Sequence, residues 1–127
     1  MKVLIVDDSA TMRRIICNVV SQIGISPEDI FQAADGKLAL QLLDNSEFKF
    51  DLILTDWNMP NMNGLQFVQT LRSNPSYKKI PIIMITTEGG KAEVITALKA
   101  GVNNYIVKPF PADTLKEKIH PFFKQSF

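Results

Sequence analysis

Short apolar runs alternate with segments of helical spacing along the chain. Four of these runs are almost unbroken and predict buried strands at residues 3–6, 52–54, 82–85 and 105–107. A fifth run, at residues 30–34, is more mixed in character. It also predicts a strand, and because it is the least apolar of the five we place it at an edge of the sheet.

Five intervening segments repeat apolar residues three or four positions apart, the spacing that puts side chains on one face of a helix. The first such face consists of Met12, Ile15, Ile16, Val19, Val20 and Ile23. The later helices are marked by Leu38, Leu42 and Leu43, by Leu65, Val68 and Leu71, by Val94, Ile95 and Leu98, and by Leu115, Ile119 and Phe122. The sequence therefore predicts one helix after each strand.

The last of these helices contains a proline. Pro121 has no backbone N–H and its ring clashes with the carbonyl four residues back, so we expect the helix to kink or stop near Ile119. Phe122, Phe123 and Phe127 would then fold back onto the core or remain partly exposed.

Strands that alternate with helices through short loops predict an α/β fold. Nearly unbroken apolar strands are typical of a parallel sheet that helices cover on both faces. Right-handed crossovers with one reversal then give a doubly wound sandwich. No repeat or long linker divides residues 1–127, so we expect one domain built on a five-stranded sheet.

Composition narrows the class of protein. The chain has 127 residues, is 46% hydrophobic and carries a net charge of +1. No apolar run approaches the roughly 18 residues of a membrane span, and no dense basic footprint indicates nucleic-acid binding. The single cysteine, Cys17, excludes an internal disulfide and suits a reducing compartment. We expect a cytoplasmic monomer that neither enters a membrane nor binds nucleic acid.

Polar residues gather where the predicted strands end. Asp7 and Asp8 follow the first strand, Asp56 follows the third, Thr86 ends the fourth and Lys108 ends the fifth. In open parallel sheets, ligands bind outside the carboxyl ends of the strands, near the point where strand order reverses. These five side chains therefore predict a site at that rim.

Each residue also has an ordinary structural explanation. Asp8 or Ser9 could cap the first helix, and Asp56 could bond its own backbone in a turn. Thr86 could be a hydrogen-bonded strand end and Lys108 a surface lysine. Together these explanations do not account for the gathering of all the exceptions at one rim, which favours a shared site.

Three carboxylates in one place repel one another unless a cation compensates them. Oxygen ligands suit a hard divalent cation that keeps several waters, which describes Mg²⁺. Zinc is disfavoured, because Cys17 and His120 lie away from this rim. Mg²⁺ and the Lys108 ammonium would balance the three negative charges and stabilise phosphoryl oxygens. Asp56 could then attack in line and form an aspartyl-phosphate.

The motifs "VDDS", "LTDWNMPNMNG", "MITTEGG" and "YIVKPF" carry these residues in order. Over residues 2–120 the chain resembles the receiver domain of two-component response regulators, and in particular the single-domain receivers of chemotaxis. The resemblance implies a flavodoxin-like sheet with strand order 2-1-3-4-5. It also implies a cis peptide bond between Lys108 and Pro109.

For the site, the resemblance implies that Asp56 accepts a phosphoryl group from a phosphohistidine of a sensor histidine kinase. Asp8, Asp56 and the backbone carbonyl of Asn58 would bind Mg²⁺, and Asp7 would assist through water. These four residues are the expected metal site.

The resemblance also implies how phosphorylation is read. Thr86 and Lys108 would contact the phosphoryl oxygens and act with Asp56 as the catalytic residues. As Thr86 moves toward the phosphoryl group, Tyr105, the switch aromatic, would turn inward. The surface around the fourth and fifth helices would then repack.

Asn58 and Glu88 lie two positions after Asp56 and Thr86 respectively, where receivers influence how fast the phosphoryl group is lost. Both residues are polar, and such a pair can hold the attacking water. The sequence therefore predicts a short-lived phosphoryl group.

Three functions remain open. The first is a phosphorylation-switched signalling protein that binds a partner such as the flagellar motor switch protein; beyond self-phosphorylation and autodephosphorylation it is not an enzyme. The second is a receiver that acts as a phosphate sink or regulates another kinase. The third is an aspartyl-phosphate phosphohydrolase, which is disfavoured because such enzymes usually carry an acid where this chain has Asn58. We expect the first.

Overall fold

A computed structural model describes residues 1–124 of the chain, with strands and helices in alternation. The elements are β1 (Val3–Val6), α1 (Ala10–Gln22), the 3-10 helix η1 (Pro27–Asp29), β2 (Ile30–Ala33), α2 (Gly36–Asn45), β3 (Leu52–Thr55), α3 (Gly64–Ser73), β4 (Ile82–Thr86), α4 (Lys91–Ala100), β5 (Asn104–Val107) and α5 (Ala112–Lys124).

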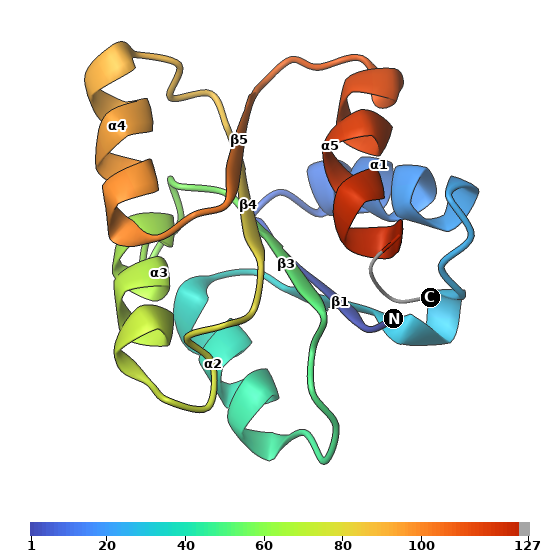
Figure 1. Cartoon of the computed structure of the whole chain (residues 1–127), viewed down its shortest axis with the longest axis horizontal. Coiled ribbons are helices and arrows are strands. Elements are labelled where there is room, and N and C mark those ends of the chain that lie inside the picture. Colours follow the sequence, from blue (N-terminus) through green and yellow to red (C-terminus); the bar gives the residue numbers. More distant parts are fainter. Residues whose placement is uncertain (125–127) are drawn as a thin grey trace.

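The strands form a five-stranded parallel sheet in the order β2-β1-β3-β4-β5. The chain therefore starts near the middle of the sheet, moves to one edge, and then reverses through β3 to the other edge (Figure 1). The reversal lies between β1 and β3. This arrangement confirms the predicted fold, including the strand order and the edge position of β2.

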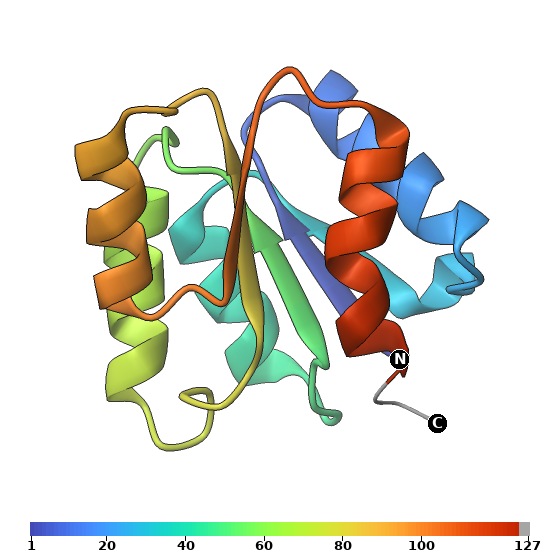
Figure 2. The same ribbon diagram turned by 45° about the horizontal axis from the view of Figure 1, so that its top comes forward.

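Helices cover both faces of the sheet. Figure 2 shows α2, α3 and α4 on one side and α1 and α5 on the other. Alternate residues of β1 serve the two sides: Leu4 and Val6 pack in the first core, while Val3 and Ile5 pack in the second. All four are at most 1% exposed. Side chains alternate across a strand, and with both faces covered every position is apolar, which explains the unbroken runs.

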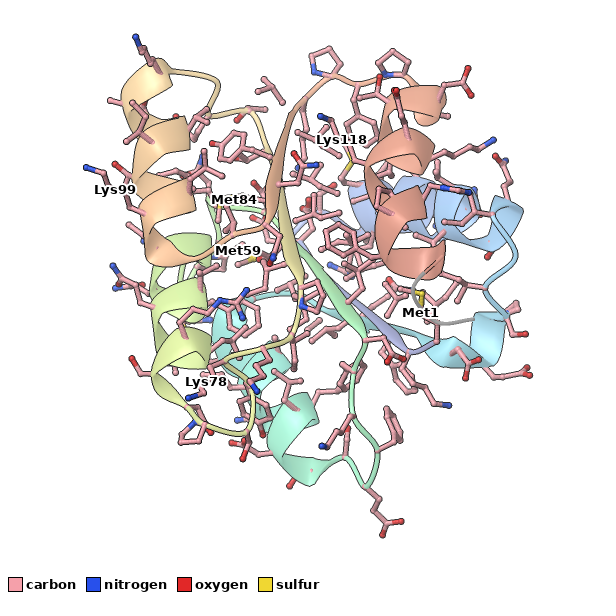
Figure 3. All side chains as sticks on the ribbon, viewed as in Figure 1. Met1, Met59, Lys78, Met84, Lys99 and Lys118 are labelled. Carbon is pink, nitrogen blue, oxygen red and sulfur yellow. The ribbon has the colours of Figure 1, made fainter. Side chains whose placement is uncertain are left out.

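Methionines and lysines show the same layering in Figure 3. Met59 and Met84 lie inside the layer between the sheet and α2–α4, whereas Lys99 points outward from α4.

Among the described residues, no helix has the length and apolar character needed to cross a membrane.

Polar side chains cap the first three α-helices. The hydroxyl of Ser9 accepts from the N–H of Met12 and caps α1. Asp35 caps α2, and Asn63 forms a capping box with Gln66 at α3. Caps of this kind satisfy N–H groups that have no partner within the helix. Because Ser9 caps α1, Asp8 remains available for another role.

The helices lie where their apolar spacing predicts, but some marker residues face solvent. Ile15 on α1 and Leu38 on α2 are 43% and 46% exposed. On α4, Ile95 and Leu98 are 41% and 47% exposed, and Ala97 is the buried residue. A small residue lets α4 approach the sheet closely, which turns the larger apolar side chains outward.

We expected α5 to kink or stop near Ile119; the helix continues through Pro121 to Lys124, so a stop there is wrong. Ile119 is fully buried, and Phe122 packs against the core that α1 and α5 share. Burying a large apolar side chain contributes about 1.5–3 kcal/mol, which offsets much of the roughly 3 kcal/mol that an interior proline costs. Phe127 and the side chain of Phe123 lie outside the described part of the chain.

Candidate functional site

Three carboxylates meet where the sheet reverses. The strands β1 and β3 are neighbours, and their register pairs Val6 with Thr55. Asp7 and Asp56 follow these two residues and are therefore side by side, with Asp8 next along the chain. Ligand oxygens of the three acids all lie within 4.8 Å of one another. The structure thus brings together the acids that the sequence placed at this rim.

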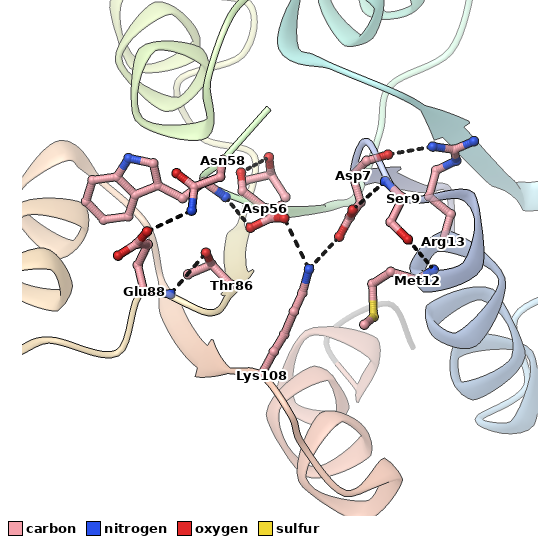
Figure 4. A network of polar contacts seen from close by, with 11 residues as sticks. Asp7, Ser9, Met12, Arg13, Asp56, Asn58, Thr86, Glu88 and Lys108 are labelled. Carbon is pink, nitrogen blue, oxygen red and sulfur yellow. Dashed lines mark hydrogen bonds and ion pairs between the residues drawn. The ribbon is translucent and has the colours of Figure 1, made fainter. Parts of the chain in front are cut away.

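Lys108 joins two of the acids. Its Nζ lies 2.7 Å from Oδ2 of Asp7 and 3.1 Å from Oδ2 of Asp56 (Figure 4). All three side chains are at most 10% exposed. Burial alone lowers the pKa of Lys108, but the hydrogen bond that Lys108 donates to Asp7 and the charges of Asp56 and Asp7 outweigh burial and raise the pKa. The lysine therefore remains an ammonium. The Lys108–Pro109 bond is cis, as expected.

The backbone of the β3–α3 loop holds Asp56. The N–H of Asp56 donates to the carbonyl of Val6 at 2.9 Å, and the N–H of Trp57 donates to Oδ1 of Asp56 at 2.6 Å. Asp56 therefore also has the local turn bond that its ordinary explanation predicted. That bond directs one carboxylate oxygen to the loop and leaves Oδ2 on Lys108.

Thr86 and Tyr105 meet at the β4–α4 loop. Thr86 is fully buried, and its Oγ1 accepts from the N–H of Glu88 at 3.4 Å. The hydroxyl of Tyr105 donates to the backbone carbonyl of Glu88. Burial, followed by the charges of Glu88, Glu93 and Asp56, raises the pKa of Tyr105 to about 12 and keeps it a donor. Both side chains therefore contact the same short segment, and Tyr105 is partly buried against the core on the α2–α4 side of the sheet.

A hydrogen bond between two side chains connects two loops of the site. Nδ2 of Asn58 donates to Oε1 of Glu88 at 2.8 Å, which links the β3–α3 loop to the β4–α4 loop (Figure 4). The sequence placed these residues at the same rim, and the structure adds that they contact each other directly.

The acid cluster of Asp7, Asp8 and Asp56 has the chemistry of a magnesium site. Its donors are carboxylate oxygens, which a hard cation prefers. One oxygen from each of the three acids lies within 4.8 Å of the other two, which is close enough for one cation to draw on all three. Cys17, by contrast, packs against the core on the α1 side. The residues present therefore fit Mg²⁺, and a group of carboxylates alone suits zinc less well.

Two residues at this rim were not identified from the sequence. Gly64 opens α3, and a Cβ added there would lie 2.0 Å from the carbonyl oxygen of Asp56. The glycine of "NMNG" gave a signal for this, since glycine often marks a close backbone approach. Arg13 donates to the carbonyl of Asp7. Nothing in the sequence separates it from Arg14.

A separate cavity of about 580 Å³ lies near the opposite end of the sheet, between the α2–β3 and α3–β4 loops. Its lining includes Phe48 and Tyr77, together with acids and lysines. None of the five rim residues lines it. The chemistry of the site is therefore carried by the rim and not by this cavity.

Comparison with known proteins agrees with this geometry. The sequence pattern of the response regulator receiver domain matches residues 3–120. The chain belongs to the response regulator receiver family. The motifs that carry Asp7, Asp8, Asp56, Thr86 and Lys108 all lie within the matched residues.

Relatives of this receiver are chemotaxis proteins. The chain is 62% identical over 120 residues to chemotaxis protein CheY1 of Helicobacter pylori, covering 94% of each chain. It is 57% identical to the CheY homologue of Campylobacter jejuni, covering 94% of this chain and 89% of that one. The solved structure of CheY4 of Vibrio cholerae has a TM-score of 0.84 at 35% identity, covering 95% and 97%. The receiver is thus a CheY-like, two-component chemotaxis response regulator.

The close approach of Gly64 to the backbone of Asp56 gives a testable prediction. Gly64→Ala would push a methyl group against the Asp56 carbonyl and the Trp57 Cα, at 2.0 and 2.8 Å. We expect it to lower the free energy of unfolding by about 1–3 kcal/mol, measured by urea denaturation.

A glycine on the next loop gives the control. A Cβ at Gly89 would meet a Val107 methyl group at 3.0 Å and no backbone atom. Gly89→Ala should change stability by no more than about 0.5 kcal/mol. Equal effects of the two substitutions would show that the contact with Asp56 is unimportant.

Proposed function

We propose that the receiver is phosphorylated on Asp56 by a sensor histidine kinase and that this switches a partner-binding surface. The observation that carries the proposal is the bridge from Lys108 to both Asp7 and Asp56, the two buried members of the acid cluster. A carboxylate in such surroundings faces two cations during phosphoryl transfer, the ammonium and the metal that the cluster fits. Residues 1–127 would act as one receiver domain.

The roles of the residues follow from their positions. Asp7, Asp8, Asp56 and the backbone carbonyl of Asn58 would hold Mg²⁺, with Asp7 acting through water. When bound, the metal supplies positive charge to the phosphoryl oxygens. Lys108 supplies the second charge.

The transfer step itself needs little from the protein beyond positioning. A carboxylate oxygen of Asp56 attacks phosphorus in line, a P–O bond forms, and the P–N bond of the kinase phosphohistidine breaks. The bonding electron pair stays on the histidine nitrogen, and the phosphohistidine, protonated on its other ring nitrogen, leaves as the neutral imidazole of the kinase. Hydrolysis of the acyl phosphate by the receiver itself then resets the protein.

Phosphorylation would be read through Thr86. The phosphoryl oxygens offer acceptors to Thr86 and Lys108, at about 1.5–3 kcal/mol for each hydrogen bond to a charged group. Moving a two-state equilibrium from 1:99 to 99:1 takes about 5.5 kcal/mol, so two such bonds supply most of it. Because Thr86 and Tyr105 both hold Glu88, movement of Thr86 would be passed to Tyr105.

The output surface would lie on α4 and β5. Ile95, Leu98 and Val107 are each more than 40% exposed, and Tyr105 belongs to the same strand as Val107. Exposed apolar side chains grouped on neighbouring elements are typical of protein-binding sites. Relatives with the chemotaxis name make the flagellar motor switch protein the proposed partner of a cytoplasmic, monomeric receiver.

The other two functions are less well supported. A phosphate sink needs the acid site but has no use for an apolar surface beside the switch tyrosine. A phosphohydrolase of the aspartyl-phosphate type would need a general acid where Asn58 stands, and an amide cannot supply a proton.

The proposal predicts phosphorylation at one residue. Incubation with acetyl phosphate and Mg²⁺ should add one phosphoryl group to the wild type, and Asp56→Asn should add none. Intact-mass spectrometry with peptide mapping is the measurement. Modification at another residue, or no modification at any phosphodonor concentration, would refute it.

The contact between Asn58 and Glu88 predicts the lifetime of that group. With the polar pair present, the phosphoryl group should be lost within minutes, because the pair can hold the attacking water. Glu88→Leu removes the polar group and should lengthen the lifetime several-fold, followed by loss of radiolabel from Asp56. A wild-type phosphoryl group that lasts many hours would contradict this prediction.

The output surface predicts a matched pair of binding results. Leu98→Ala should weaken binding of a motor-switch peptide to the beryllofluoride-treated receiver by about ten-fold, the size expected for a buried apolar contact. Leu38→Ala, at an equally exposed leucine on α2, should leave binding unchanged. Fluorescence anisotropy of a labelled peptide measures both, and equal losses would place the partner elsewhere.

A further inference from the structure

Arg13 is a half-buried cation at the acid site to which neither the catalytic nor the metal-binding role assigns a function. It lies on α1, in the turn that follows the capping residue Ser9. Its Nη1 donates to the backbone carbonyl of Asp7 at 2.6 Å, and its Nε donates to Oε1 of Gln32 at 3.1 Å (Figure 4 shows the first contact). One guanidinium therefore ties the β1–α1 loop to the edge strand β2.

Asp7 is held at every polar group. Its N–H, carbonyl, Oδ1 and Oδ2 bond respectively to Ala33, Arg13, Ser9 and Lys108. Asp8 is different, because it is exposed and its carboxylate has no hydrogen bond or ion pair within residues 1–122. The backbone that precedes Asp8 is thus what directs its carboxylate toward the other two acids.

The peptide group between Asp7 and Asp8 is the part of that backbone that Arg13 holds. A hydrogen bond to the Asp7 carbonyl fixes the plane of this peptide and so restricts where the Asp8 side chain can reach. The guanidinium suits this task because its donors form a rigid planar fork, and Gln32 anchors the second edge of that fork.

We propose that Arg13 is a positioning residue for the metal site. It orients the Asp7–Asp8 peptide so that the Asp8 carboxylate converges with Asp7 and Asp56 on one cation. The inference rests on the proposed function, since it takes Mg²⁺ as the ligand of the acid cluster. It adds a residue that contacts neither the metal nor the phosphoryl group.

Position and charge make opposite predictions for this arginine. A positive charge close to the acids repels a cation, so its removal should strengthen Mg²⁺ binding if charge alone matters. Loss of an orienting hydrogen bond should instead weaken binding, typically by 10- to 100-fold for partners behind the ligands themselves. The sign of the change therefore separates the two roles.

The test is a titration with Mg²⁺ followed by the fluorescence of Trp57, the only tryptophan of the chain. Trp57 follows Asp56 in the chain, and its backbone N–H donates to the Asp56 carboxylate. Arg13→Gln should raise the Kd for Mg²⁺ by about 10-fold. Arg13→Lys keeps the charge without the planar fork, and its Kd should also exceed that of the wild type.

Two further variants complete the design. Arg14→Gln removes the same charge from an exposed neighbour that makes no side-chain hydrogen bond among the described residues. Its Kd should equal or fall below that of the wild type. Gln32→Ala removes the outer anchor and no charge, and should raise the Kd by less than Arg13→Gln does.

The outcomes are distinct. A folded Arg13→Gln protein, as judged by circular dichroism, that binds Mg²⁺ as tightly as the wild type would overturn the inference, and so would an equal weakening by Arg14→Gln. If Arg13→Gln does not fold, Gln32→Ala decides, and an unchanged Kd there overturns the inference. A wild type without any response to Mg²⁺ would instead refute the proposed metal site.

Discussion

The ammonium of Lys108 holds two buried carboxylates that lie 101 and 52 residues away along the chain. Charges with so little access to water are stable only when they are paired, and removal of one partner leaves an uncompensated buried charge. The pairing is possible because β1, β3, β4 and β5 are consecutive in the sheet and end at the same rim. The site therefore forms only if the strands have this order.

Around this ion pair, each loop supplies different residues of the site. The β1–α1 loop carries Asp7 and Asp8, and the β3–α3 loop carries Asp56 and Asn58. The β4–α4 loop receives hydrogen bonds from Asn58 and Tyr105, and its own backbone N–H donates to the hydroxyl of Thr86. A change in charge at Asp56 can thus reach the segment that leads into α4 through a few direct contacts.

Apolar periodicity predicted the elements better than it predicted their exposed faces. It identified the five strands and the five α-helices but not the 3-10 helix η1, because both faces of the sheet are covered and each α-helix must bury a stripe. It placed Ile95 and Leu98 of α4 among the core markers, whereas the packing of Ala97 turns them outward. The helix α5 does not stop near Ile119 for a similar reason, since burial of neighbouring side chains offsets much of a local preference.

The sequence by itself determined the fold class, the edge strand and the set of acids, hydroxyl and amine that end the strands, because these depend on period and order. The resemblance to receivers added roles for those residues. Only the tertiary structure decided which oxygens Lys108 bridges, that Asn58 reaches Glu88, and that Arg13 and not Arg14 holds the Asp7 carbonyl. Such contacts join residues far apart in the chain, and their geometry depends on how the helices pack on the sheet.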